Sequence, residues 1–218
     1  MCATMLCSAC SKDDGDELDK GFVPSSMAVD LGLSVKWASV NVGASKPEEY
    51  GEYYAWGETE AKVHYDWDTY KYCSSDRYMI KYSINYGVQD NIRTLELGDD
   101  VAHVKYGGDW RMPTKTEWEE LKFKCDWTWT SRNGVNGYEV KSKTNGNTIF
   151  LPTGGRKGYK DNSTDPIFIG EDGYYWTSSL STERSYYAQF LRFDSESVKL
   201  VDEGLQRDGG ISVRAVCK

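Results

Sequence analysis

The sequence predicts an α+β domain built mostly of short antiparallel strands, with two helices close together near the middle of the chain. Short runs in which apolar and polar residues alternate recur along the chain, and 8 Trp, 16 Tyr and 21 Gly against 5 Pro are typical of strands joined by loops. Helical patterns occur in two neighbouring stretches, 99–107 and 114–124. Many short strands with segregated helices indicate an α+β fold.

The clearest single element is the helix over 114–124, which follows Pro113. Thr114 stands three residues before Glu117, and this spacing predicts a capping box. The Thr114 hydroxyl would accept from the backbone N–H of Glu117, and the Glu117 carboxylate would accept from that of Thr114. Apolar residues at i, i+3 and i+7 would form one buried stripe: Trp118, Leu121 and Cys125.

A shorter helix is predicted directly upstream. Asp99 or Asp100 would cap its start, and Gly107 would end it. Val101 and Val104 would face inward. The two helices therefore form one block, which ends the first half of the chain.

The predicted strands are short. The first covers 29–42, where alternation predicts one half-buried strand with Leu31 and Trp37 on its inner face. Asn145-Gly146 is a hairpin signal, because its turn needs positive φ, and Gly134 and Gly137 are expected to turn the chain. Further strands are expected at 127–130, 138–142, 148–152, 174–179, 187–193, 198–200 and 211–216, and 53–57 is either a short strand or a loop pinned by aromatic side chains.

Several functional classes are disfavoured by composition and motifs. The net charge is -8 with no basic block, which argues against nucleic acid as a partner. The glycine-rich loop 153–158 lacks the Lys-Ser/Thr pair and the following helix of a phosphate-binding loop. In the Tyr-rich stretch 60–97, His64, Asp66 and Asp68 have no second His at ligand spacing. We therefore predict a long aromatic loop there, and neither a metal nor a cofactor.

The N-terminus has its own character. Small residues directly before Cys10 resemble a bacterial lipoprotein processing site, and Ser11-Lys12-Asp13-Asp14 is similar to the acidic signal that sends some Gram-negative lipoproteins to the outer face of the outer membrane. The apolar region is short and no charged region precedes it, so we interpret 1–10 as a truncated signal. Cys10 would carry a lipid anchor in the membrane, and 11–26 would be a flexible acidic tether. The alternative is a disordered tail with chance cysteines.

Residues 27–218 then form one domain, and its motifs resemble a known family. Arg111-Met112-Pro113-Thr114 through Glu117-Trp118-Glu119 is similar to the helix motif of the formylglycine-generating-enzyme branch of the C-type-lectin-like fold. The opening 29–38, the strand 174–179 and the closing Ser212-Val213-Arg214 resemble FISUMP-type domains of bacterial surface lipoproteins. The resemblance implies paired N- and C-terminal strands, two helices on one side and an irregular face for ligands.

The same resemblance suggests where a ligand would bind. In variable proteins of diversity-generating retroelements, which this chain also resembles, the last meander before the closing strand forms the binding surface. By position, that surface corresponds here to Tyr186, Tyr187, Phe190, Arg192, Asp194, Lys199, Asp202, Gln206, Arg207 and Asp208. Aromatic, charged and amide side chains suit a recognition face. An ordinary solvated sheet face remains the alternative for each residue.

The cysteines bear on the enzyme hypothesis. The formylglycine-generating enzymes need reactive cysteines in the C-terminal half, whereas Cys73, Cys125 and Cys217 lie far apart in sequence and match no such motif. Outside the cytoplasm one disulfide is expected, and we favour the pair Cys125 and Cys217. The calcium-dependent sugar motifs of animal lectins are absent from the sequence as well.

The sequence thus favours a non-catalytic surface lipoprotein that binds an external glycan or protein through its loop-rich C-terminal face. One alternative is a structural subunit of a surface complex or fimbria, for which an open sheet edge would be the sign. The other is an enzyme on a formylglycine-generating-type scaffold. The identity of the ligand and the oligomeric state stay open.

Overall fold

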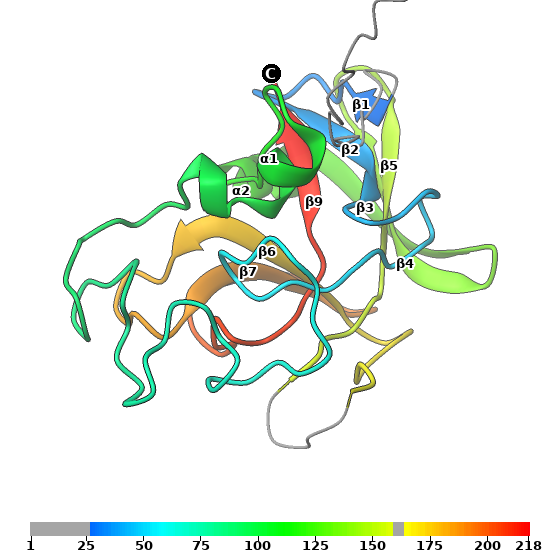
Figure 1. Ribbon diagram of the computed structural model, residues 1–218. Helices are drawn as coiled ribbons and strands as arrows, with labels where there is room; N and C mark the ends of the chain where they lie inside the picture. Colours follow the sequence, from blue (N-terminus) through cyan, green and yellow to red (C-terminus); the bar gives the residue numbers. More distant parts are fainter. Residues whose placement is uncertain (1–26, 159–163) are drawn as a thin grey trace, which may run out of the picture.

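The computed structural model describes residues 27–158 and 164–218 (Figure 1). The predicted signal, the lipidation site Cys10 and the acidic tether lie outside these residues. The elements are β1 (Ala28–Val29), β2 (Lys36–Asn41), η2 (Leu97–Asp99), α1 (Val101–Tyr106), α2 (Lys115–Lys124), β3 (Cys125–Arg132), β4 (Val135–Ser142), β5 (Thr148–Pro152), β6 (Gly173–Leu180), β7 (Ala188–Phe193), β8 (Val198–Val201) and β9 (Arg214–Cys217). The predicted α+β class with mostly antiparallel strands is confirmed.

The opening and closing strands pair, as predicted. In the order β1-β2-β9, Trp37 of β2 lies opposite Val216 of β9 in an antiparallel ladder. Buried Arg214 reinforces the junction, because its guanidinium donates to the Asn41 side chain at 2.8 Å and to the carbonyl oxygen of Phe150 in β5 at 2.8 Å. One side chain therefore joins the first strand pair to the next sheet.

The first strand differs from the prediction in two ways. The stretch 29–42 is not one strand, because the chain bends between β1 and β2, where Gly32 has φ of +67°. The alternation also ends at Ala38, which is fully buried although strict alternation would place it on the face opposite to that of Trp37. Both faces of β2 are covered, so hydrophobic alternation cannot continue there.

Both helices form as predicted, except that Val104 of α1 is exposed and does not face inward. Asp100 caps α1 by accepting from the backbone N–H groups of Ala102 and His103, and the Thr114–Glu117 capping box starts α2. The Asp100 carboxylate also accepts from the Met112 N–H at 2.8 Å. It therefore fixes the entry to α2 as well as the start of α1.

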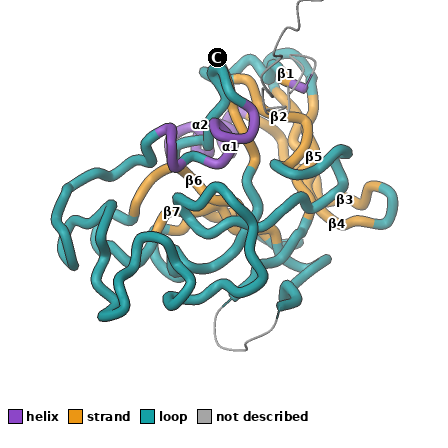
Figure 2. Tube along the Cα trace, viewed as in Figure 1, coloured by secondary structure: helices purple, strands orange, loops and turns teal. Residues whose placement is uncertain are grey.

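The other two sheets are antiparallel meanders, β3-β4-β5 and β6-β7-β8 (Figures 1 and 2). The predicted turn at Asn145-Gly146 lies between β4 and β5, and Gly146 has φ of +77°. Asn133 and Gly134, both at positive φ, form the two-residue turn between β3 and β4. Gly137 does not turn the chain. It lies within β4, where a Cβ would stand 2.3 Å from the carbonyl oxygen of Leu151.

Two hydrophobic clusters share the interior. One lies around Trp56 and Trp176, and the other around Trp37 and Trp118. None of the helices in the described residues has the length and apolar character needed to cross a membrane.

The predicted disulfide between Cys125 and Cys217 is wrong for this structure. Both are buried free thiols, Cys125 in the Trp37–Trp118 cluster and Cys217 in the other. Burial raises the pKa of the Cys125 thiol to about 11 and raises that of Cys217. Each thiol packs as a small apolar group in its own cluster.

Candidate ligand-binding face

Four aromatic side chains from distant parts of the chain meet on one face. We call Trp67, Tyr78, Tyr86 and Tyr186 the aromatic cluster. The Tyr78 and Tyr86 rings stack with centroids 5.1 Å apart and planes 3° apart. Tyr186 lies 4.8 Å from the Tyr86 ring and 5.9 Å from the Trp67 ring. The long loop supplies three of these rings, and the segment before β7 supplies the fourth.

The aromatic cluster is partly exposed, with Trp67, Tyr86 and Tyr186 half-buried. Tyr78 is 53% exposed, and two apolar neighbours in the same loop, Ile80 and Val88, are 50% and 58% exposed. The backbone N–H of Val88 donates to the carbonyl oxygen of Met79 at 2.8 Å, which brings the two arms of the loop together. An exposed group of large apolar side chains on one loop is typical of an interaction surface.

Buried Arg207 holds the loop under the aromatic cluster. Its guanidinium donates to the carbonyl oxygens of Tyr82 and Ser185 at 2.9 Å each, and to the Tyr70 hydroxyl at 2.9 Å. Its central carbon lies 4.9 Å from the Trp56 ring centroid. The side chain is fully buried. Arg207 therefore joins the long loop, the segment before β7 and the core.

Two carboxylates, those of Asp90 and Asp99, hold the part of the long loop around Tyr82. Asp90 accepts from the N–H groups of Tyr82 at 2.7 Å and Ser83 at 2.9 Å. Asp99 accepts from Lys81 at 2.6 Å and from the Tyr82 hydroxyl at 2.7 Å. Burial alone would raise the pKa of Asp99, but hydrogen bonds from Lys81 and other donors hold it well below its usual range. The carboxylate is therefore charged at neutral pH.

Tyr186 is an uncharged member of the aromatic cluster. Burial, and next the hydrogen bond with Tyr86, raise the pKa of Tyr186 well above its ordinary value. Its hydroxyl is therefore protonated at physiological pH. Gln206 accepts from the Trp67 indole N–H at 3.2 Å and orients that ring. The face offers neutral ring surfaces with polar edges, which suits binding rather than acid–base chemistry.

The structure brings together only part of the predicted surface. Tyr186 and Gln206 both contact Trp67, and Tyr187 forms a bridge to Gln206. Arg192 lies near the far end of β7, about six strand positions or roughly 20 Å from Tyr186. The predicted binding residues therefore form two separate groups.

The second group lies on β7 and β8. Arg192 and Lys199 are opposite each other in the ladder, and both are exposed. Arg192 pairs with Asp172 at 3.1 Å. Asp194 caps the following turn by accepting from the Ser197 N–H at 2.8 Å. Because Asp172 pairs with Arg192 and Asp194 also lies near it, this group carries charges of both signs, and it shares no residue with the aromatic cluster.

Three of the predicted contact residues are wrong because they are buried. Phe190 packs on Trp176 in the core, Arg207 is fully enclosed, and Asp208 is only 7% exposed. A fourth, Asp202, is half-buried and is used internally, because it accepts from the Gln189 side chain at 2.7 Å. These side chains support the face through internal contacts and are not available to bind a ligand.

Tyr78, Tyr86 and Trp67 were not among the predicted site residues. The signal was present, since the stretch 60–97 is rich in tyrosine and too long for a plain connection. Nothing in the local sequence indicates that this loop folds onto the segment before β7, because Tyr86 and Tyr186 are a hundred positions apart.

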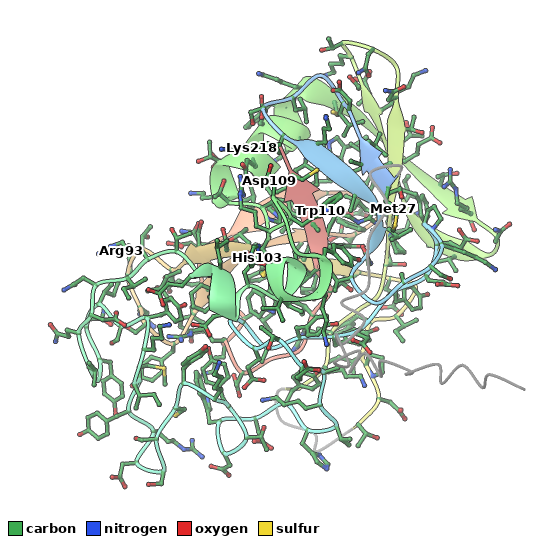
Figure 3. All side chains as sticks on the ribbon, turned by 45° about the horizontal axis from the view of Figure 1, so that its top comes forward. Met27, Arg93, His103, Asp109, Trp110 and Lys218 are labelled. Carbon is green, nitrogen blue, oxygen red and sulfur yellow. The ribbon has the colours of Figure 1, made fainter. Side chains whose placement is uncertain are left out.

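A hollow of about 500 Å³ lies elsewhere, beside the C-terminal end (Figure 3). Its walls include Asp30, Lys36, Asp109, Trp110 and Lys218. A smaller hollow of about 180 Å³ adjoins it and is lined in part by His103, whose Nδ1 lies 3.1 Å from the Trp110 carbonyl oxygen. Charges of both signs surround these hollows, and they share no residue with the aromatic cluster.

Within residues 27–158 and 164–218, no three or more His, Cys, Asp or Glu side chains gather in a way that could hold a metal ion. No protein-family model, curated protein or solved structure matches the chain. The geometry of this face is therefore the main indication of a function.

Proposed function

We propose that this protein is a non-catalytic binding protein that takes an external ligand on the aromatic cluster. The observation that carries the proposal is the stacked pair of exposed Tyr78 and half-buried Tyr86, joined by Tyr186 and held from below by Arg207. A rigid base under exposed rings reduces the ordering that binding would otherwise require.

A glycan is the ligand class that this chemistry favours. Tyrosine and tryptophan rings present flat apolar faces with a negative quadrupole, and their O–H and N–H groups lie at the edge. A sugar ring has an apolar face of C–H groups and a rim of hydroxyls, so it complements both features. A protein ligand would use the same rings as hot spots, and the experiment below separates the two.

We further propose a C-type-lectin-like fold of the FISUMP type and a lipid-anchored place on the outer membrane surface. Paired terminal strands, the capped tryptophan-bearing helix α2 and the loop-rich face support the fold proposal. The localisation proposal is supported by the sequence around Cys10 alone. Labelling intact cells with a membrane-impermeant reagent, in the wild type and in Cys10→Ala, tests it.

The binding proposal is tested by a glycan array and a protein-partner screen with the wild type and the double variant Tyr78→Ala with Tyr86→Ala. Losing two stacked rings is expected to weaken binding by about 2 kcal/mol or more, roughly thirtyfold. The matched control is Phe123→Ala, which removes a ring that is 70% exposed on α2, away from the face.

The two screens give distinct outcomes. A glycan signal that the double variant loses and Phe123→Ala keeps supports the proposal. If the double variant loses a protein partner that Phe123→Ala still binds, the aromatic cluster is the binding face but its ligand is a protein. Binding that survives in the double variant, with the fold intact by circular dichroism, would contradict the proposed site.

A further inference from the structure

The β3–β4 hairpin projects from the body of the molecule and carries an open sheet edge (Figure 2). In the order β3-β4-β5, β3 pairs along all eight of its residues with β4, and within the described chain it has no strand on its other side. Unpaired N–H and C=O groups along such an edge are a template for another strand. Neither a proline nor a bulge interrupts Cys125–Arg132.

The turn fixes which backbone groups face outward. Asn133 and Gly134 form a two-residue loop closed by the pair Arg132 and Val135. Such a closing pair exchanges both backbone hydrogen bonds, and the ladder then alternates. Even-numbered residues of β3 therefore bond to β4. The odd-numbered ones turn their N–H and C=O groups to the open edge: Trp127, Trp129 and Ser131.

The side chains of β3 are complementary to those of a second β3 strand that runs antiparallel to it. About a twofold axis through Trp129, an antiparallel copy would place Asp126 opposite Arg132 and Thr128 opposite Thr130, each twice by symmetry. Trp129 would exchange backbone bonds with its symmetry mate, and Trp127 with Ser131. The charged and threonine pairs would occupy the non-hydrogen-bonded positions, where facing side chains lie closest.

We propose that β3 is a homodimerisation edge, paired with β3 of a second copy of this chain in the register centred on Trp129. Charge complementarity selects this occupant, because the register brings together two Asp126–Arg132 pairs. Inside one chain Asp126 has a loose partner, Lys143 at 3.5 Å, and both of these side chains are more than half exposed. Asp126 is therefore available. The aromatic cluster shares no residue with β3, so the dimer would present two binding faces.

Sedimentation equilibrium of the purified protein over a range of concentrations tests the proposal. The wild type is expected to show a concentration-dependent monomer–dimer equilibrium. Asp126→Arg and Arg132→Glu are each expected to weaken the dimer by about tenfold, since both symmetric pairs become like-charged. The combined charge swap restores the pairs and is expected to bring dimerisation back to within about threefold of the wild type. Lys199→Glu, an exposed charge reversal on β8, is the matched control.

A second variant tests the backbone contribution. Ser131→Pro removes an outward N–H that β4 does not use, and proline is tolerated on such an edge. It is expected to abolish the dimer, whereas Ser131→Ala keeps it. If Ser131→Pro fails to fold, the charge swap decides alone. The proposal would be overturned if the wild type is a monomer at every concentration. It would also be overturned if neither charge reversal weakens the dimer, or if the combined charge swap does not restore dimerisation.

Discussion

Arg207 shows how a charged residue can serve the binding face from inside. A buried guanidinium is costly unless its donors are satisfied. Here the carbonyl oxygens of Tyr82, Ser185 and Lys81, together with the Tyr70 hydroxyl, accept from it. These acceptors come from three separated segments. The residue therefore converts the long loop into a fixed base for the rings.

The first prediction concerns this residue. Arg207→Met should destabilise the protein by about 3 kcal/mol, because buried acceptors are left without donors. Urea unfolding measures the change. Hydrogen exchange should become faster across 65–90 and stay unchanged in β3 and β4. Arg184→Ala removes an exposed arginine that pairs loosely with Glu203 at 3.4 Å, and it should change stability by less than about 0.5 kcal/mol. Equal effects of the two variants would contradict this role.

The second prediction concerns Asp208, the neighbour of Arg207. Burial raises the pKa of its carboxyl to about 7, although its own backbone N–H and Lys62 favour the charged form. Nearby Asp66 and Glu58 oppose ionisation as well. Since the pKa is higher in the folded than in the unfolded chain, Asp208 lowers stability as pH rises from about 4 to about 7.

Asp208→Asn should therefore stabilise the protein at pH 8 by about 1–3 kcal/mol, with a gain that shrinks towards pH 4. Thermal or urea unfolding across this range measures it. The matched control is Asp68→Asn, at an exposed position of the long loop. A constant difference at all pH values would contradict the predicted ionisation of Asp208.

Side-chain chemistry alone could not distinguish surface from interior at positions 190, 207 and 208. Arg207 and Asp208 carry ionisable groups, and Phe190 shares a predicted strand face with Arg192, so all three fit an exposed face. The burial of Arg207 depends on the long loop, whose acceptors lie more than a hundred positions away in sequence. Phe190 is buried against Tyr174 and Trp176 of β6. Tyr186 and Gln206 were predicted as contact residues, and both do contact half-buried Trp67 of the aromatic cluster.

At the scale of the element, α2 is specified almost wholly by its own residues. Glu117 receives the Thr114 N–H at 2.8 Å, and Arg111 pairs with the same carboxylate through both of its terminal nitrogens, at 2.8 and 2.5 Å. Cap and ion pair are both local, within six positions, which is why sequence spacing could predict the start of the helix. The open edge of β3 could not be predicted in this way, because the local sequence does not indicate whether another strand pairs with β3.

The third prediction tests the cap. Thr114→Ala should destabilise the protein by about 1 kcal/mol, because the Glu117 N–H loses its acceptor and the helix start loses half of its capping box. Chemical denaturation measures the change. Thr116→Ala, at an exposed position in the first turn, is the matched control and should be neutral or slightly stabilising. A larger effect from the control would contradict the capping role.

At the scale of the whole molecule, the two hydrophobic clusters are joined through shared strands. Trp176 of β6 belongs to one cluster and Tyr175 to the other, and in β9 Ala215 and Val216 divide in the same way. Alternate side chains of a strand point to opposite faces. Strands β6 and β9 therefore form the wall between the clusters, and β9 also pairs with β2.

Periodicity in sequence could indicate the strands of this wall but not its two-sided burial. The run 211–216 alternates as a half-buried strand would, yet every residue of β9 is buried. The second covering layer comes from the helix block and from the long loop. Contacts of that kind depend on packing between segments far apart in the chain, which short-range patterns do not encode.

The last prediction follows from this shared wall. Val216→Ala removes buried side-chain volume from the Trp37–Trp118 cluster only and should destabilise the protein by about 2 kcal/mol. Because β9 serves both clusters, the whole domain should still unfold in one transition at a lower urea concentration. Tryptophan fluorescence, near-UV and far-UV circular dichroism should give the same midpoint. Ser195→Ala, at an exposed position between β7 and β8, should leave that midpoint in place. Two separated transitions would show that the clusters are independent and that β9 does not unite them.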